Sequence, residues 1–314
     1  MNYLKYVVLI VASALLTGCP LPFEMNFQGP LPTAKWLTSF EENGNITVFY
    51  PVNQDGTTKG LADLPVIILN TGWNQPRATY EGYGEQYAQW GMVCVLRPVI
   101  SLGLAGTGAP LFEENVQANF RLMDWLVGQD QDPQSPLYEL IDPLNIGETG
   151  HSQGAGVAIE VTVRDPRVKA CVSIDGNFAG PVFDPRPLLP EVNAAIMYLY
   201  SSEGKWCSGP PGANFGIAKP LYDFTAPPTT RISIIGADHI DFFDTPVGLG
   251  HLANYFCPRG TADAQDVRDI AHRYGIAWFG VYLKGLSMLE PYYHGAYSDM
   301  DEASGIVSIQ RRLE

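Results

Sequence analysis

The chain has 314 residues and a net charge of −14; 46% of its residues are apolar and only 17% are charged. This composition favours a globular fold over a disordered or coiled-coil chain, and it is enough for one large packed core. A surface this acidic repels phosphate backbones, so we expect no nucleic-acid partner.

Residues 1–18 have the features of an export signal. One lysine precedes the apolar stretch 7–16, which is too short to span a bilayer comfortably and is therefore typical of a cleaved signal. The segment Leu-Thr-Gly-Cys that follows resembles the bacterial lipobox, which implies that Cys19 is lipidated and becomes the mature N-terminus. Lipid chains would hold an exported lipoprotein on the cell envelope, at the outer membrane or the cell surface. The alternative is ordinary signal cleavage with a spare cysteine.

After the signal, we expect a stalk at 19–40 and a single domain at 41–314, since no repeat or later linker divides the chain. Within the domain, strand-like and helix-like runs alternate, which predicts an α/β fold with a mainly parallel sheet flanked by helices on both faces. The run 64–70 (LPVIILN) is continuously apolar, as in a strand buried on both sides. The polar tail 292–314 is assigned to no element. We expect strands at 46–50, 64–70, 92–97, 145–150, 168–174, 194–201 and 231–235, and helices at 80–90, 114–127, 153–163 and 264–283.

Four cysteines follow Cys19, and an exported protein occupies a compartment where disulfides persist. Cys207 and Cys257 lie in loops rich in glycine and proline, and we expect them to form a disulfide. Cys94 and Cys171 lie within strand-like runs and are interpreted as buried thiols that pack as small apolar groups. No cluster of cysteine and histidine has the spacing of a zinc site.

The pentapeptide Gly150–Gly154 (GHSQG) fits the pattern G-x-S-x-G. A short strand-like run precedes it and a helix-like run of small residues follows, which is the strand–turn–helix setting that this nucleophile motif requires. Gly150 and Gly154 allow a sharp turn and close packing, and His151 should point away from the reacting group. We therefore expect Ser152 at the sheet edge as a nucleophile. The alternative is a glycine-rich turn with a solvent-facing serine.

A serine hydroxyl is a weak nucleophile and needs a general base. His239 follows the run that we interpret as the last strand and is the candidate base, with His251 as the rival. The base needs a carboxylate to orient it, and Asp175 and Glu203 both end strand-like runs, so sequence order leaves both open. Two further acids are interpreted as solvated loop charges, namely Asp241 and Asp244.

Two backbone amides should stabilise the negative oxygen that forms on the substrate. The amide of Gln153, the residue after the nucleophile, is expected to be one of them. The loop after strand 64–70 should supply the other, and Trp73 is the candidate. The indole of Trp73 would also line the acyl or alcohol pocket, unless it serves only in packing.

With these residues, the chain resembles the platelet-activating-factor acetylhydrolase branch of the α/β-hydrolases, and more loosely dienelactone hydrolases and cutinase-type polyester hydrolases. The match lies in the GHS-x-G elbow at Gly150–Gly154 and in the loop 236–244 (GADHIDFFD), which resembles the histidine loop of that branch. The resemblance covers roughly 64–283 and is patchy between the motifs. It implies the α/β-hydrolase fold, and it implies Asp175 as the acid, because a glutamate at the position of Glu203 lies outside the triad there.

These residues predict an exported serine hydrolase that cleaves carboxylic esters through an acyl-enzyme, without a metal or organic cofactor. No long lid segment is evident between Ser152 and His239, which favours short-chain acyl or accessible polymeric esters as substrates. One alternative is a cutinase-type polyester hydrolase or lipase that uses Glu203, and another is a peptidase, although the chain has no room for the propeller that many such peptidases carry. An alternative from another class is a binding lipoprotein that kept the scaffold without activity.

Overall fold

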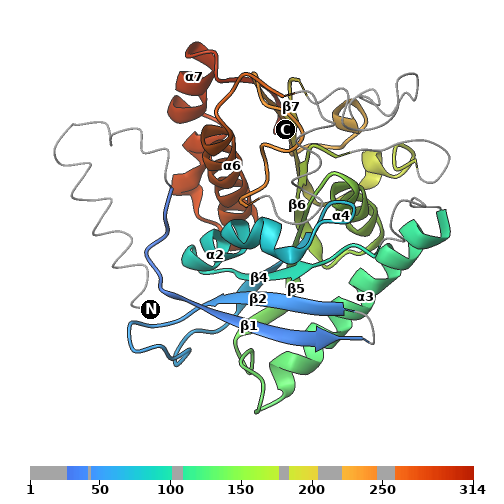
Figure 1. Cartoon of the computed structure of the whole chain (residues 1–314), viewed down its shortest axis with the longest axis vertical. Coiled ribbons are helices and arrows are strands. Elements are labelled where there is room, and N and C mark those ends of the chain that lie inside the picture. Colours follow the sequence, from blue (N-terminus) through green and yellow to red (C-terminus); the bar gives the residue numbers. More distant parts are fainter. Residues whose placement is uncertain (1–26, 42–43, 101–108, 177–183, 204–220, 246–258) are drawn as a thin grey trace.

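The computed structural model describes residues 27–41, 44–100, 109–176, 184–203, 221–245 and 259–314 (Figure 1). Its strands form one nine-stranded sheet with the order β1-β2-β4-β3-β5-β6-β7-β8-β9. The six strands from β4 to β8 in this order are parallel, whereas β1, β2 and β9 run antiparallel to their neighbours. The strands are β1 Thr33–Phe40, β2 Gly44–Pro51, β3 Leu64–Asn70, β4 Val93–Arg97, β5 Ile141–His151, β6 Val168–Ile174, β7 Ala195–Ser201, β8 Thr229–Ile234 and β9 Val307–Arg312.

Helices cover both faces of this sheet, with α2 and α6 on one side and α3 and α4 on the other (Figure 1). α6 contacts β5, β6 and β7, while α4 contacts β3, β5 and β6 on the opposite face. The predicted α/β class with a mainly parallel sheet is therefore confirmed. The helices are η1 Arg77–Tyr80, α2 Glu81–Gln89, α3 Ala109–Gln131, α4 Gln153–Arg164, η4 Leu189–Glu191, η6 Leu221–Asp223, α6 Ala264–Lys284, η7 Ser287–Tyr292 and α7 Ala296–Ala303.

The central strands are buried on both faces, which explains their continuous apolar sequences. In β3, Ile67 and Leu69 enter the core under α2 and α6, whereas Val66 and Ile68 enter the core under α3 and α4. A strand between two helical layers has no solvent-facing side, so alternation of polar and apolar residues is lost. Because β3, β5, β6, β7 and β8 are parallel, the loops after their carboxyl ends meet at one edge of the sheet.

Both outer strands were missed by the sequence prediction. Residues 33–40, assigned to the stalk, form β1 and pair along their whole length with β2, so this part of the assignment is wrong. Likewise, 231–235 does not contain the last strand, because β9 in the polar tail pairs antiparallel with β8. Both outer strands alternate between more and less exposed residues, and each needs its neighbour to satisfy its backbone hydrogen bonds.

The described cysteines behave as predicted. Cys94 and Cys171 are free, fully buried thiols, and burial raises the pKa of both well above the ordinary value. The expected lipidation site Cys19 and the expected disulfide between Cys207 and Cys257 lie outside the described residues. No helix in the described ranges is both long enough and apolar enough to cross a bilayer.

Candidate active site

Ser152 lies at the turn between β5 and α4, as the glycine motif predicts. It is the residue before the first turn of α4, and its backbone angles are φ 56° and ψ −120°. Such angles are rare for a residue with a side chain and cost on the order of 1–3 kcal/mol. The amide of Ser152 donates to the carbonyl of Ile174, which places the turn directly beside the end of β6.

The two glycines of the motif are required by close backbone contacts. A Cβ atom on Gly154 would lie 2.1 Å from the carbonyl oxygen of Asn70 and 2.4 Å from that of Thr71. A Cβ atom on Gly150 would lie 2.4 Å from the carbonyl carbon of Gly154. The start of α4 therefore rests on the backbone at the end of β3, with no room for a side chain between them.

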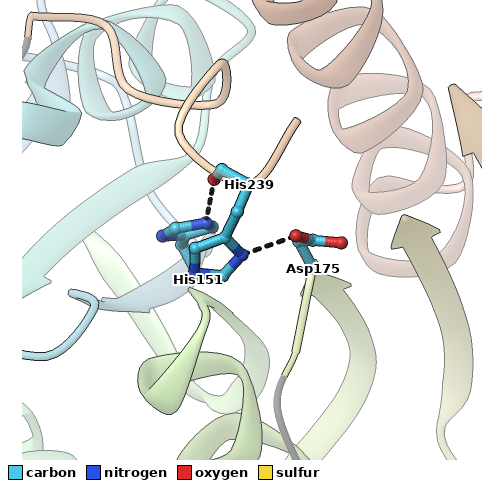
Figure 2. A group of neighbouring side chains, drawn as sticks. All are labelled: His151, Asp175 and His239. Atoms are coloured by element: carbon cyan, nitrogen blue, oxygen red, sulfur yellow. Dashed lines mark hydrogen bonds and ion pairs between the residues drawn. The ribbon is translucent and has the colours of Figure 1, made fainter. Parts of the chain in front are cut away.

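Asp175 and His239 form the central polar contact of this edge. The Nδ1 atom of His239 lies 2.5 Å from Oδ2 of Asp175 (Figure 2), and both side chains are mostly buried. Asp175 follows β6, and it also accepts hydrogen bonds from the amide and the hydroxyl of Ser201 at the end of β7. Burial alone would raise the pKa of Asp175, but the hydrogen bonds from His239 and Ser201 hold it below its ordinary value. The carboxylate is thus kept ionised beside the imidazole.

The loop that carries His239 is held by buried carboxylates. Asp238 is fully buried and accepts hydrogen bonds from the amides of Ile240, Asp241 and Gly260. Asp241 is 1% exposed and accepts a hydrogen bond from the amide of Asp238. The interpretation of Asp241 as a solvated charge is wrong, because it closes the turn from within.

Asp244 was also interpreted as a solvated loop charge, and it too has a structural role. Its carboxylate accepts a hydrogen bond from the amide of Tyr83 in α2 and lies 3.0 Å from Nε2 of His272 in α6. Its own amide donates to the carbonyl of Thr79 in η1. Asp244 therefore fastens the end of the histidine loop to the helices beneath it.

His151, the last residue of β5, is buried beside the ring of His239, with 4.5 Å between the two ring centres. Its Nε2 atom lies 2.9 Å from the carbonyl oxygen of His239, and its Nδ1 atom lies 2.9 Å from the hydroxyl of Tyr80. Burial, together with the nearby His239, lowers the pKa of His151 to about 3. The ring is therefore neutral at ordinary pH.

The expected oxyanion donors belong to two segments, namely the start of α4 and the loop after β3. Gln153 is the first residue of α4, so its amide has no acceptor within the helix and points out of the helix N-terminus. Trp73 lies in the loop after β3, where Gly72 donates its amide to the hydroxyl of Tyr80. Trp73 is 37% exposed, which places it among the exposed large apolar residues of the described part of the chain.

A buried polar cluster supports the start of that loop. Asn70, the last residue of β3, donates to a carboxylate oxygen of Glu148 and accepts from Arg97 and Asn119. Arg97 also donates to Asn115 of α3. Burial raises the pKa of Glu148 well above its ordinary value, despite the nearby charge of Arg97. These contacts fix the end of β3 on the face covered by α3 and α4.

Most of the candidate residues in the described ranges converge on this edge, but two pairs do not meet. Glu203 is exposed, and its carboxylate accepts a hydrogen bond from Ser202 rather than from His239. Within the described residues, the hydrogen bonds of His239 go to Asp175 and His151, and none joins its ring to the Ser152 hydroxyl. Catalytic hydrogen bonds are often long before substrate binds and tighten in the complex. The rival base His251 lies outside the described residues.

Two supporting residues escaped the sequence prediction. Ser201 binds both carboxylate oxygens of Asp175, and Tyr80 binds His151. Ser201 is the last residue of β7, and Asp175 follows the neighbouring strand β6, so this position at adjacent strand ends is the signal that could have identified Ser201. Tyr80 approaches from a helix 71 residues away in the chain, and nothing local indicates its partner.

The described residues contain one group of side chains suited to a metal ion, and it coincides with this site. Potential ligand atoms of His151, Asp175 and His239 lie within 4.8 Å of one another (Figure 2). However, both ring nitrogens of His151 are already engaged in buried hydrogen bonds. A cation bound by all three would have to break those bonds, so the arrangement fits proton transfer better than metal binding.

Comparisons with known proteins leave the chain without an assigned family. No protein-family model matches it, and no curated protein matches it either. The functional interpretation therefore depends on the motif, its strained turn and the hydrogen bonds around His239.

The contact at Gly154 generates a prediction about stability. Gly154→Ala should lower the free energy of unfolding by about 1–3 kcal/mol, because its Cβ would overlap two backbone carbonyls that cannot move independently. Gly128→Ala is the matched control, since it is also helical but has nothing near its Cβ position, and it should stabilise by about 0.5–1 kcal/mol. Urea unfolding of both variants measures the difference, and equal effects would contradict the close contact.

Proposed function

We propose that this protein is an exported serine hydrolase of the α/β-hydrolase fold that cleaves carboxylic esters. Ser152 is its nucleophile, His239 its general base and Asp175 the acid that orients the base. The observation that carries the proposal is the short hydrogen bond between His239 Nδ1 and Asp175 Oδ2, at the edge where Ser152 occupies a strained strand-to-helix turn.

Three further features support this assignment. The chain order serine, aspartate, histidine is the order found in α/β-hydrolases. The mainly parallel sheet gives the strand ends from which such a site is built. The side chain of Glu203 is exposed and hydrogen-bonds to Ser202, whereas the ring of His239 hydrogen-bonds to Asp175, which favours Asp175 as the acid and weakens the alternative with a glutamate triad.

The proposed reaction is acyl transfer to water. The Ser152 oxygen attacks the ester carbonyl carbon while Nε2 of His239 takes the hydroxyl proton. Asp175 keeps the proton of the resting imidazole on Nδ1, which leaves Nε2 unprotonated, and it stabilises the imidazolium that forms. The amides of Gln153 and Trp73 hold the negative oxygen. His239 then protonates the leaving alcohol and activates the water that cleaves the acyl-enzyme.

The surroundings of the site support the proposed substrate class. Trp73 is partly exposed next to its proposed oxyanion amide, so its ring is available to an apolar acyl or alcohol group. The net charge of −14 disfavours anionic substrates, because the field of the protein repels them. Neutral esters with short acyl chains, or accessible neutral polyesters, fit these features best.

The proposed location is the cell envelope, with lipid on Cys19. The folded part begins early, since the ring of Phe27 stacks on Trp90 at 4.6 Å between ring centres. Only residues 20–26 separate this contact from the lipidated cysteine, and even a fully extended chain of that length spans only about 25 Å. The domain would therefore work close to the membrane surface rather than at the end of a long stalk.

A fluorophosphonate probe, which reacts with activated serines, tests the nucleophile. Wild-type protein should be labelled and should hydrolyse p-nitrophenyl acetate, whereas Ser152→Ala should do neither, because the attacking oxygen is missing. Ser39→Ala, which removes a surface hydroxyl on β1, is the matched control and should retain both activities. Equal labelling of Ser152→Ala and wild type would refute the proposal.

The orienting acid is tested by removing its charge without changing its shape. Asp175→Asn should reduce kcat by about 10³–10⁴-fold, because the amide cannot hold the same histidine tautomer or stabilise the imidazolium. Glu203→Gln should leave kcat nearly unchanged, since in the described part of the chain its carboxylate hydrogen-bonds to Ser202 and not to His239. Steady-state kinetics with p-nitrophenyl acetate measure both, and the opposite pattern would transfer the role to Glu203.

The anchor is tested in the cell that makes the protein. Cys19→Ser should move the protein from the membrane fraction to the soluble fraction, because the thiol that carries the lipid is gone. Cell fractionation with immunoblotting measures the distribution. A membrane fraction that stays the same in Cys19→Ser would argue against lipidation.

A further inference from the structure

His151 makes two buried hydrogen bonds that the proposed reaction does not use. The side chain is 1% exposed, so it does not face substrate. One ring nitrogen meets the backbone carbonyl of His239, and the other meets the hydroxyl of Tyr80. The same hydroxyl receives the amide proton of Gly72 over 3.2 Å.

These contacts form a series of hydrogen bonds, and the groups at its two ends, the carbonyl of His239 and the amide of Gly72, fix the direction of each bond. A carbonyl oxygen only accepts, so Nε2 of His151 must carry the proton that binds His239. In the neutral ring Nδ1 then has a free lone pair and accepts the Tyr80 hydroxyl proton. The Tyr80 oxygen in turn accepts the Gly72 amide. The hydrogen bonds therefore run from Gly72 through Tyr80 and His151 to His239, with donor and acceptor fixed at each step.

This series of hydrogen bonds joins the three parts of the proposed active site. Gly72 belongs to the loop that presents the Trp73 amide, His151 precedes the nucleophile, and His239 is the base. Gly72 packs closely against both side chains, since a Cβ atom on it would lie 3.0 Å from the Tyr80 hydroxyl and 3.2 Å from Nδ1 of His151. The oxyanion loop is thus held against the elbow at this point.

Aromatic packing and the neutral state of both side chains keep these hydrogen bonds in place. The rings of His151 and Tyr80 both contact Phe243 edge to face, at 5.2 and 5.8 Å between centres. The titratable groups that face the His151 ring are Tyr80, His239 and, behind it, Asp175. Burial raises the pKa of Tyr80, and burial lowers that of His151, so both groups stay neutral and the order of donors is preserved.

We propose that His151 and Tyr80 are positioning residues that couple the oxyanion loop to the backbone of the catalytic histidine. This inference rests on the proposed function and deepens it, because it assigns the middle residue of the elbow and a tyrosine from η1 to the same machinery. The Tyr80 hydroxyl sets the distance between the Gly72 loop and the elbow. The Nε2–H group of His151 holds the His239 backbone in the position from which its ring meets Asp175.

Removing one hydroxyl tests the coupling in the full-length protein. Tyr80→Phe leaves the Gly72 amide and Nδ1 of His151 unpaired, and kcat for p-nitrophenyl acetate should fall about 10–100-fold with KM nearly unchanged, as expected when reacting groups are misplaced. Tyr83→Phe is the matched control, because Tyr83 is equally buried but its hydroxyl has no hydrogen-bond partner among the described residues. It should leave kcat unchanged. Equal kcat values for the two variants would overturn the proposal.

A second measurement needs no substrate. Long-range proton–nitrogen NMR of the histidine rings should show His151 in the neutral Nε2–H form down to about pH 5, since its pKa is lowered to about 3. The ring signals of His239 should shift in Tyr80→Phe and stay in place in Tyr83→Phe. A protonated His151 at pH 6, an Nδ1–H tautomer, or unmoved His239 signals in Tyr80→Phe would each overturn the inference.

The two measurements separate this inference from the proposed function. If wild-type protein neither reacts with a fluorophosphonate nor hydrolyses esters, the proposed function fails, and the NMR result still decides whether the series of hydrogen bonds from Gly72 to His239 exists. If wild-type protein is active but Tyr80→Phe retains full kcat, the function stands and the positioning role fails.

Discussion

The hydrogen bond between His239 and Asp175 is the interaction on which the candidate site depends. It joins two residues 64 positions apart, so it exists only because β6 and the histidine loop after β8 end at the same sheet edge. Burying a carboxylate is costly unless its oxygens are hydrogen-bonded. Ser201 satisfies the oxygens that His239 leaves, which lets Asp175 stay ionised in a mostly buried place. A charge-assisted bond of this kind fixes both the tautomer and the direction of the imidazole.

The surrounding polar groups act as rigid supports rather than as solvated charges. Asp238 and Asp241 satisfy the amides of the turn that carries His239, and the cluster around Asn70 holds the end of β3. Such buried networks cost free energy when they are incomplete, but a satisfied network permits one arrangement only. The strained backbone of Ser152 is tolerated for the same reason, since the strands and α4 on either side determine where it must lie.

The sequence predicted those features whose signal is local. The strand–glycine–helix pattern around Ser152 and the continuous apolar run of β3 each depend on neighbouring residues, so the elbow and the buried sheet were found. The outer strands β1 and β9 were missed because they are half exposed and are defined by pairing with a neighbour. Residue order left Asp175 and Glu203 open until the resemblance favoured Asp175. The hydrogen bond between Asp175 and His239 joins residues that are distant in the sequence. The contact of Tyr80 with His151 is equally distant, and no sequence signal indicated it.

The separation of the two proposed oxyanion donors depends on Gly154, which has no side chain. The amide of Gln153 belongs to α4, whereas that of Trp73 belongs to the loop after β3, and nothing in the local backbone of either fixes the other. The contact of Gly154 with the carbonyls of Asn70 and Thr71 brings the two segments together at backbone distance. Any larger residue there would move one donor relative to the other. Because oxyanion stabilisation requires both amides at about 2.7–3.1 Å from one oxygen atom, the glycine acts on the chemistry through geometry alone.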